Sequence, residues 1–371
     1  MGIVEDIRAL VNSLDEENTT DVNSKERAHI EAHILEQFFP LGIELLRKEA
    51  KDEAREELQK QYSIIRQGTA TNEVTKIATR KKTKPELTST GDAKFRHGDF
   101  MLNVKNYMQT AGIRTSAHQL LDALCEELTR GGVQDFIVRI PLRKYMNMRG
   151  LKDEKSARQQ IKEDLQTLSH FRMEFNEKRR KSKSTPYYDL AIIGSNGIEN
   201  SYIEAAFDPR FIELYKTYNP MPYPQILWKL NNKHHPHSYY FGRKISEHKN
   251  LNYGNPNEDI ISVVTLIKAS PLMPTEEEAS GKHYKQLIIE PFEADMDALD
   301  EILTWEYCHN KGTPLTDEEL TTLYNSGGYH FFTTLLIHVH WQDYPTRPPK
   351  TKKRTTTRKK QKTVSTDIII L

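Results

Sequence analysis

The stretch "RGLKDEKSARQQIKEDLQTL", residues 149–168, has the spacing of one amphipathic helix. Its apolar residues recur every three or four positions and therefore share one face: Ala157, Ile161, Leu165 and Leu168. Asp153 precedes them at the position of a helix N-cap. The opposite face is polar and holds Lys155, Arg158, Gln159, Lys162 and Gln166. Such a face is either a solvated helix surface or a surface that lies in a DNA groove.

The segments around this helix predict a compact domain over 95–219. "SAHQLLDALCEELTR" predicts a helix capped by Ser116, "DFIVRI" a strand, and "PLRKYMNMRG" a short helix from Pro141 to Gly150. "FRMEFNEK" and "YYDLAIIG" predict paired strands around the basic turn "RRKSKSTP", and "SNG" a second hairpin turn into "SYIEAAF". Asp208 and Pro209 then open a closing helix. A helix-turn-helix followed by a β-hairpin is a winged helix.

A looser copy of this order is predicted over 220–345. "HSYYFGRKISEHKN" and "VTLIKASP" predict helices on either side of a strand in "DIISV". "KHYKQLIIEPFEADMDALDEI" predicts a longer helix that Pro291 kinks or shortens. "LTWEYCH" and "LLIHVHW" predict the strands of a second wing, with a helix capped by Thr316 inserted between them.

The remaining segments are predicted to flank these domains. Residues 1–68 have the composition of a helical N-terminal extension, 69–94 that of a linker, and 346–371 that of a disordered tail. The run 346–363 holds nine Lys or Arg and no acid, which suits either a polyanion-binding arm or a solubilising tail. We therefore expect an α+β protein with two tandem winged-helix domains, an α-helical N-terminal extension and a disordered basic C-terminal tail.

The composition indicates a chain outside the membrane. Of the 371 residues, 37% are hydrophobic and 28% are charged, and no apolar run is long enough to span a bilayer. The N-terminus lacks the pattern of a signal peptide, and the two cysteines are too few and too far apart for a disulfide scaffold. We expect a cytoplasmic protein without a membrane partner.

Three segments resemble replication initiators of iteron plasmids and related mobile elements: "IPLRKYMNMRGLKDEKSARQQIKEDLQTL", "LWKLNNKHHPHSYYFGRKISEHKN" and "YKQLIIEPFEADMDALDEI". The resemblance covers roughly 95–345. It implies sequence-specific binding to double-stranded DNA at origin repeats and recruitment of host replication proteins. Candidate partners beyond DNA are a host replication initiator, a helicase and a second copy of the chain. The helical extension and the acidic turn "PLMPTEEEASGK" depart from the family pattern.

Candidate DNA-binding residues fall into three groups. On the helix of 153–168, Arg158 suits guanine and Gln159 adenine, while Lys155 and Lys162 suit phosphates. The alternative is a solvated face on which Asp153 or Glu154 pairs with Arg158. The basic turn holds Lys178, Arg179, Arg180, Lys181 and Lys183, which suit phosphates or protect a sheet edge. The resemblance alone adds Lys282, His283, Lys285 and Gln286 in the second unit.

The strongest signal for an enzyme is "HVH" at 338–340. His338 and His340 alternate on a strand and suit one metal ion, as in HUH-type nicking enzymes, for which Tyr239 and Tyr240 are candidate nucleophiles. The alternative is that both histidines point outward while Ile337 and Val339 are buried. No Walker A loop or nucleophile elbow occurs, so we expect no enzyme activity and no cofactor. A winged-helix transcription regulator is a third alternative.

Overall fold

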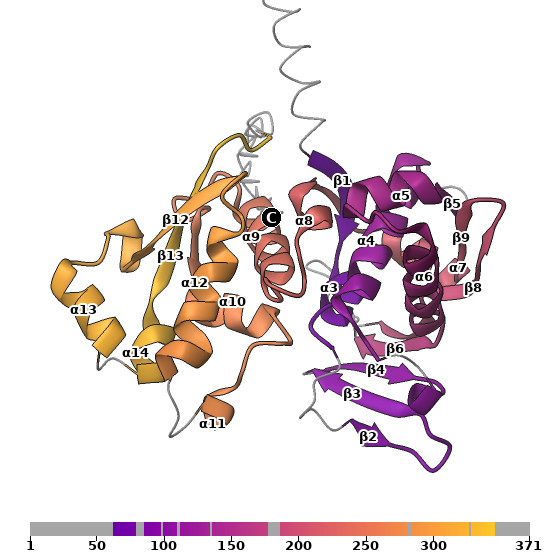
Figure 1. Cartoon of the computed structure of the whole chain (residues 1–371), viewed down its shortest axis with the longest axis horizontal. Coiled ribbons are helices and arrows are strands. Elements are labelled where there is room, and N and C mark those ends of the chain that lie inside the picture. Colours follow the sequence, from indigo (N-terminus) through magenta and orange to yellow (C-terminus); the bar gives the residue numbers. More distant parts are fainter. Residues whose placement is uncertain are drawn as a thin grey trace, which may run out of the picture.

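The computed structural model describes residues 62–78, 85–97, 99–109, 112–133, 136–176, 186–279, 284–325 and 328–345. Two α+β units lie side by side, one built from the indigo to magenta part of the chain and one from the orange to yellow part (Figure 1). The α+β class predicted from the sequence is confirmed. The expected helices before residue 62 and the tail after residue 345 lie outside the described residues.

The helix-turn-helix of the first unit forms where the sequence predicts it. It comprises α4 (Thr115–Arg130), β5 (Ile137–Pro141), α5 (Leu142–Arg149) and α6 (Glu154–Ser169). Gly150 ends α5 in the left-handed conformation with φ of 62°. Asp153 caps α6 by accepting a hydrogen bond of 2.7 Å from the backbone N–H of Ser156. The expected cap at Ser116 is wrong: Arg114 holds that position, and Ser116 is buried inside α4.

The wing of the first unit differs from the expected one. β6 (Phe171–Asn176) and β7 (Tyr187–Ala191) pair as predicted, but they belong to a five-stranded sheet. Its order is β2 (Glu86–Leu87), β3 (Ala93–His97), β4 (Phe100–Val104), β6 and β7. The hairpin that joins β5 is formed by β8 (Ile193–Glu199) and β9 (Tyr202–Phe207), in the order β5-β9-β8. Its turn is Asn200-Ser201, both at positive φ, and not the expected "SNG". Alternation along a strand identifies its faces but not its partner.

Part of the expected extension and linker belongs to the packed fold. β1 (Tyr62–Gln67) pairs antiparallel with β10 (Asn219–Pro224), so residues 62–67 are not helical. α3 (Thr69–Val74), β2 (Glu86–Leu87) and β3 (Ala93–His97) follow, and β3 pairs with β4 (Phe100–Val104). The linker expected over 69–94 is therefore wrong for its described residues, because these elements bury Val74 and Ala93.

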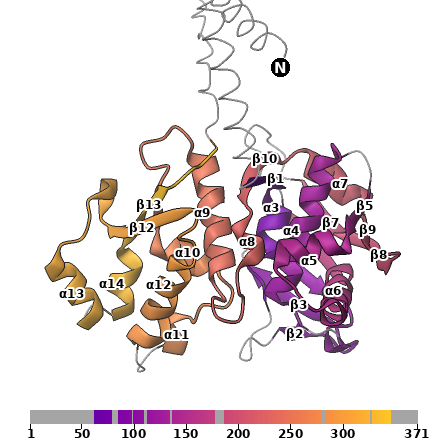
Figure 2. The same ribbon diagram turned by 45° about the horizontal axis from the view of Figure 1, so that its top comes forward.

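The first unit closes as the sequence predicts, through a helix that follows β9. Asp208 caps α7 (Pro209–Lys216) by accepting from the N–H of Arg210 at 2.8 Å. β10 and the short helix α8 (Ile226–Lys229) then lead into the second unit. α8 lies between the two units in both ribbon views (Figures 1 and 2).

The second unit repeats the order of the first. Its helices are α9 (Ser238–Asn252), α10 (Val263–Ala269), α11 (Glu276–Ala279) and α12 (Glu290–Asp297), with β11 (Ile260–Ser262) before α10. β12 (Leu303–Cys308) and β13 (Leu336–Trp341) enclose α13 (Asp317–Asn325) and α14 (Gly328–Thr334). The sheet order β11-β13-β12 matches β5-β9-β8. The same three-strand order thus occurs in both units.

The expected long helix before β12 is interrupted. Residues Lys285–Ile289 form a π-helical turn that continues into α12, with Pro291 in the first turn of α12. Proline has no backbone N–H to donate to the carbonyl four residues earlier, so a regular α-helix cannot run through this position. A π-turn is one way to accommodate the missing bond.

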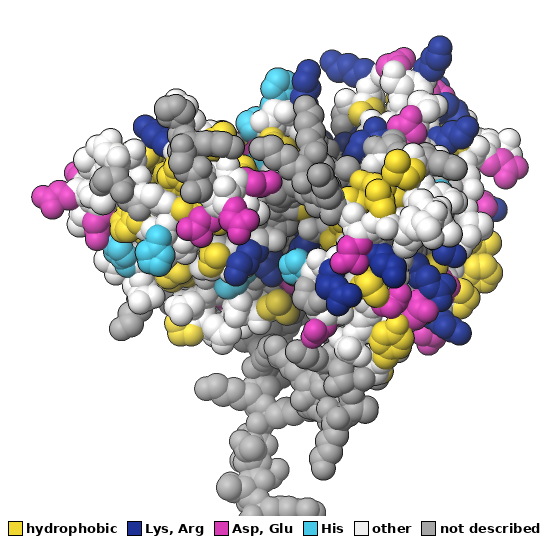
Figure 3. Space-filling view, turned by 90° about the horizontal axis from the view of Figure 1, so that it is seen from below, with side chains coloured by type: hydrophobic (Ala, Val, Ile, Leu, Met, Phe, Trp, Pro, Cys, Tyr) yellow, Lys and Arg dark blue, Asp and Glu magenta, His cyan; other side chains and the backbone are white. Residues whose placement is uncertain are grey.

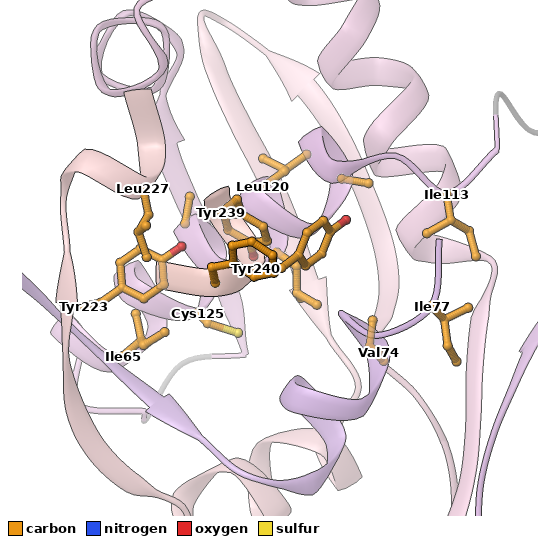
Figure 4. Packing of buried hydrophobic residues seen from close by; sticks show 14 of the residues in the cluster. Ile65, Val74, Ile77, Ile113, Leu120, Cys125, Tyr223, Leu227, Tyr239 and Tyr240 are labelled. Atoms are coloured by element: carbon orange, nitrogen blue, oxygen red, sulfur yellow. The ribbon is translucent and has the colours of Figure 1, made fainter. Parts of the chain in front are cut away.

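The two units share one core, in which α4 is the central element. Most of α4 is buried, and α9 packs against it with Tyr239 and Tyr240 beside Leu120 and Cys125 (Figure 4). Asp122 of α4 accepts from Arg243 Nε at 2.9 Å and from the Tyr239 hydroxyl at 2.7 Å. These buried polar contacts fix the second unit on the first. None of the described helices is long and apolar enough to cross a membrane.

Candidate DNA-binding surface

The apolar face of α6 is fully used in packing. Ala157, Ile161, Leu165 and Leu168 are each at most 3% exposed. Next to them, the carboxyl group of Asp164 is buried and accepts from the Ser116 hydroxyl of α4 at 3.0 Å. Burial raises the pKa of Asp164 to about 6. The buried face and the cap at Asp153 leave α6 a single orientation, and the sequence predicts which face is turned outward.

The outward face of α6 contains the five residues predicted for it. Lys155, Gln159, Lys162 and Gln166 are exposed and Arg158 is half-buried. Arg158 Nε donates to Glu154 Oε1 at 2.8 Å, and Gln159 Nε2 donates to Glu163 Oε1 at 2.7 Å. Among the described residues, the lysines of this face have no carboxylate partner.

The contacts on this face are weak enough to exchange. An exposed ion pair at i,i+4 stabilises a helix by about 0.3–0.5 kcal/mol, whereas a bidentate contact with the correct base contributes about 1–3 kcal/mol. A guanine edge can therefore draw Arg158 away from Glu154. Gln159 makes a comparable local contact with Glu163, and Glu163 also accepts from Arg114 Nη2 at 2.5 Å. The pairing of Arg158 with Glu154 is thus compatible with a solvated helix surface and also with a surface that contacts DNA.

The sequence analysis did not identify two exposed basic side chains that lie near α6. Arg143 lies in the first turn of α5, and Lys152 lies in the turn directly before the Asp153 cap. A helix-turn-helix contacts DNA phosphates with its first helix and its turn as well as with its second helix. The signal in the sequence was the position of Lys152 within the turn between the two predicted helices.

The predicted basic turn lies outside the described residues, with Lys178, Arg179, Arg180, Lys181 and Lys183. Its flanking strands are described, and Arg172 and Asp189 link them through two hydrogen bonds of 2.6 and 2.8 Å. β6 and β7 therefore form a pair in a sheet other than the one that contains β5, β8 and β9. The hairpin formed by β8 and β9 has the sequence Glu199-Asn200-Ser201 at its turn, which contains no lysine or arginine.

In the second unit, Lys285 and Gln286 are exposed on the π-helical turn, while Lys282 and His283 lie outside the described residues. Lys285 Nζ lies 5.2 Å from the ring centroid of Tyr324, a cation–π distance. The preceding helix α11 adds three glutamates, of which Glu276 and Glu277 are exposed and Glu278 is half-buried. On the face shown in Figure 3, Lys and Arg gather mainly over the first unit. The electrostatics of this face favour the first unit for DNA contact.

The candidate enzyme residues are divided between two environments. Tyr239 and Tyr240 are at most 2% exposed, and burial raises the pKa of Tyr239 far above its ordinary value. They cannot meet a DNA strand without opening the core. His338 and His340 point outward from β13, while Ile337 and Val339 are buried, as the alternative reading predicts.

No family model matches the chain, and no curated protein sequence matches it. Two solved structures of domains 2 and 3 of RctB align with it, each at a TM-score of 0.37, with sequence identities of 9% and 12%. Each alignment covers 72% of this chain, and 96% and 95% of the respective solved chains. At this TM-score the likeness carries no assignment of fold or function, and the fold is described from the geometry above.

Proposed function

We propose that the chain is a sequence-specific, double-stranded DNA-binding replication initiator of a plasmid or mobile element. The observation that carries the DNA-binding part is α6: a helix-turn-helix holds its apolar face on α4 and leaves its polar face in solvent. The second unit has the same strand order and therefore offers a second candidate surface for contact with DNA bases. In this proposal DNA binding needs no cofactor.

In the proposed complex α6 lies in the major groove. Arg158 contacts guanine through O6 and N7, and Gln159 contacts adenine through N6 and N7. Lys155 and Lys162 contact phosphates, which set the register of the helix without reading sequence. The buried junction between α4 and α9 fixes the distance between the two units. We therefore infer a target site with two parts at constant spacing.

The initiator role follows the sequence resemblance to iteron-plasmid initiators. It adds origin repeats as the DNA target and host replication proteins as partners. Selection of bound fragments from the chain's native element tests the target, and a replication assay with the selected fragment tests the role. Replication that depends on the chain supports an initiator. Binding that represses a promoter but does not support replication indicates a transcription regulator instead.

A nicking enzyme is the second candidate, favoured by the position of Glu306 beside His338 and His340. Incubation of an origin oligonucleotide with the chain and Mg²⁺ or Mn²⁺ tests it. We expect no cleavage, because the two tyrosines proposed as nucleophiles are buried. Cleavage that His338→Gln and His340→Gln abolish would replace the non-enzymatic initiator with this second function.

A further inference from the structure

Three potential metal ligands share the solvent face of the second unit's sheet. His338 and His340 alternate on β13 with Ile337 and Val339, whose burial turns both imidazoles outward. Glu306 on β12 is the direct cross-strand neighbour of His338. Directly opposite residues of an antiparallel pair have Cβ atoms only about 5 Å apart, so the fold itself brings the carboxylate to the histidines.

The distances between these groups suit a common ion. His340 Nε2 lies 3.1 Å and His338 Nδ1 lies 3.7 Å from Glu306 Oε1. All three candidate ligand atoms lie within 4.8 Å of one another. Around a tetrahedral zinc ion with ligand bonds of about 2.0–2.2 Å, neighbouring ligand atoms are roughly 3.4 Å apart. Small side-chain rotations therefore convert this cluster into three corners of such a site.

We propose that Glu306, His338 and His340 bind one divalent transition-metal ion of the zinc class. Two imidazoles and one carboxylate favour Zn²⁺, Co²⁺ or Ni²⁺ over Mg²⁺ and Ca²⁺, which prefer all-oxygen sites. The three residues are between 31% and 48% exposed, so water completes the coordination. The bound ion joins β12 to β13 on the outside of the sheet. This site does not depend on DNA binding, and no catalytic step is assigned to it.

The backbone beside His338 closes one side of the cluster. Gly312 ends the turn Asn310–Gly312 with φ of 77°, and a Cβ built there would lie 3.4 Å from His338 Nδ1. Glycine allows both this backbone conformation and the close approach of the turn to the imidazole. The turn thus restricts where His338 can place its ring.

The test uses the full chain, freed of metal with a chelator and titrated with Co²⁺, whose visible absorption reports coordination. We expect saturation at one equivalent, displacement by Zn²⁺ and no displacement by Mg²⁺. His338→Gln, His340→Gln and Glu306→Gln should each weaken binding by at least about tenfold. His309→Gln is the matched control, because His309 also pairs with one glutamate, Glu319, at 2.9 Å, but among the described residues this pair has no second histidine to complete a metal-binding group. The affinity of the His309→Gln variant for Co²⁺ should equal that of the wild type.

A second readout on the wild type covers the case in which a variant fails to fold. Nitrogen-15 NMR spectra of the imidazoles should show that Zn²⁺ shifts two of the 14 histidines together at one equivalent. No saturable binding, binding that survives the double change at His338 and His340, or equal loss in His309→Gln would overturn the proposal. A shift of other histidines in place of these two would do the same.

Discussion

At the scale of single residues, the contact that most constrains the molecule is the pair between Asp122 and Arg243. Both side chains are at most 5% exposed, and the two residues are 121 positions apart in sequence. Arg243 also donates to Asn72 Oδ1 at 2.9 Å, so the same guanidinium reaches α3. A buried ion pair adds little compared with a well-packed apolar pair, but loss of one partner leaves an uncompensated charge.

Asp122→Asn should therefore lower the free energy of unfolding by about 3–5 kcal/mol, measured by urea denaturation. Glu204→Gln is the control, because Glu204 pairs with Arg139 at 2.6 Å on the surface, where solvent screens the pair and its contribution to stability is small. Equal effects of the two changes would show that the junction is not held by its buried charge pair.

His118 gives the fold a pH dependence. Burial, followed by the nearby charge of Arg243, lowers the pKa of His118 to about 3. Below pH 6.5 the unfolded chain binds a proton there that the folded chain does not, so stability falls as pH falls. Between pH 6.5 and 5, the wild type should lose roughly 1.5–2 kcal/mol more than His118→Asn. Parallel pH profiles of the two proteins would contradict the burial of a neutral His118.

At the scale of elements, local patterns in the sequence predict α6 better than they predict the sheets. The apolar stripe and the cap at Asp153 lie within 16 residues, and short-range spacing determines both. β1 could not be predicted in this way, since its partner β10 follows about 150 residues later. The hairpin of β6 and β7 is predicted correctly because its strands are close in sequence. Its assignment as the wing is wrong, because the pairing of β6 with β4 is a long-range contact.

The strand assignment of residues 62–67 can be tested with two neighbouring isoleucines. Ile65 is 1% exposed and Ile64 is 48% exposed, as alternation in a strand requires. Ile65→Ala should destabilise the protein by about 2–5 kcal/mol through lost packing, whereas Ile64→Ala should change stability by less than about 0.5 kcal/mol. Thermal unfolding of both variants measures the difference. A large effect of Ile64→Ala would contradict the pairing with β10.

At the scale of the whole molecule, the fold consists of two α+β units with the same three-strand order, joined by one core. The sequence predicts the repeat because each unit has the same order of elements. It does not predict the rigid junction, which depends on α4, α9 and the β1–β10 pair meeting in space. The outward position of Lys155, Arg158, Gln159, Lys162 and Gln166 follows the prediction, while their contact with DNA remains a prediction.

The basic tail supports a prediction about salt dependence. Each phosphate that a lysine or arginine neutralises releases condensed counterions, so a basic arm steepens the fall of affinity with salt. Deletion of 346–371 should flatten this dependence and leave the preferred DNA sequence unchanged. Binding titrations at several salt concentrations, on selected and random duplexes, measure both quantities. A changed sequence preference would show that the tail reads bases.

The central claim, that the outward face of α6 reads DNA, is tested most directly by base preference at a selected site. Arg158→Ala and Gln159→Ala should each relax preference at one defined base pair, with a loss of about 1–3 kcal/mol at the selected sequence. Lys162→Ala should weaken binding to all sequences nearly equally. Ile161→Ala is the structural control, because Ile161 is buried in the core. After correction for the fraction of folded protein, this variant should keep the base preference of the wild type. Unchanged affinity and preference in both Arg158→Ala and Gln159→Ala would show that this face of α6 is only a solvated surface.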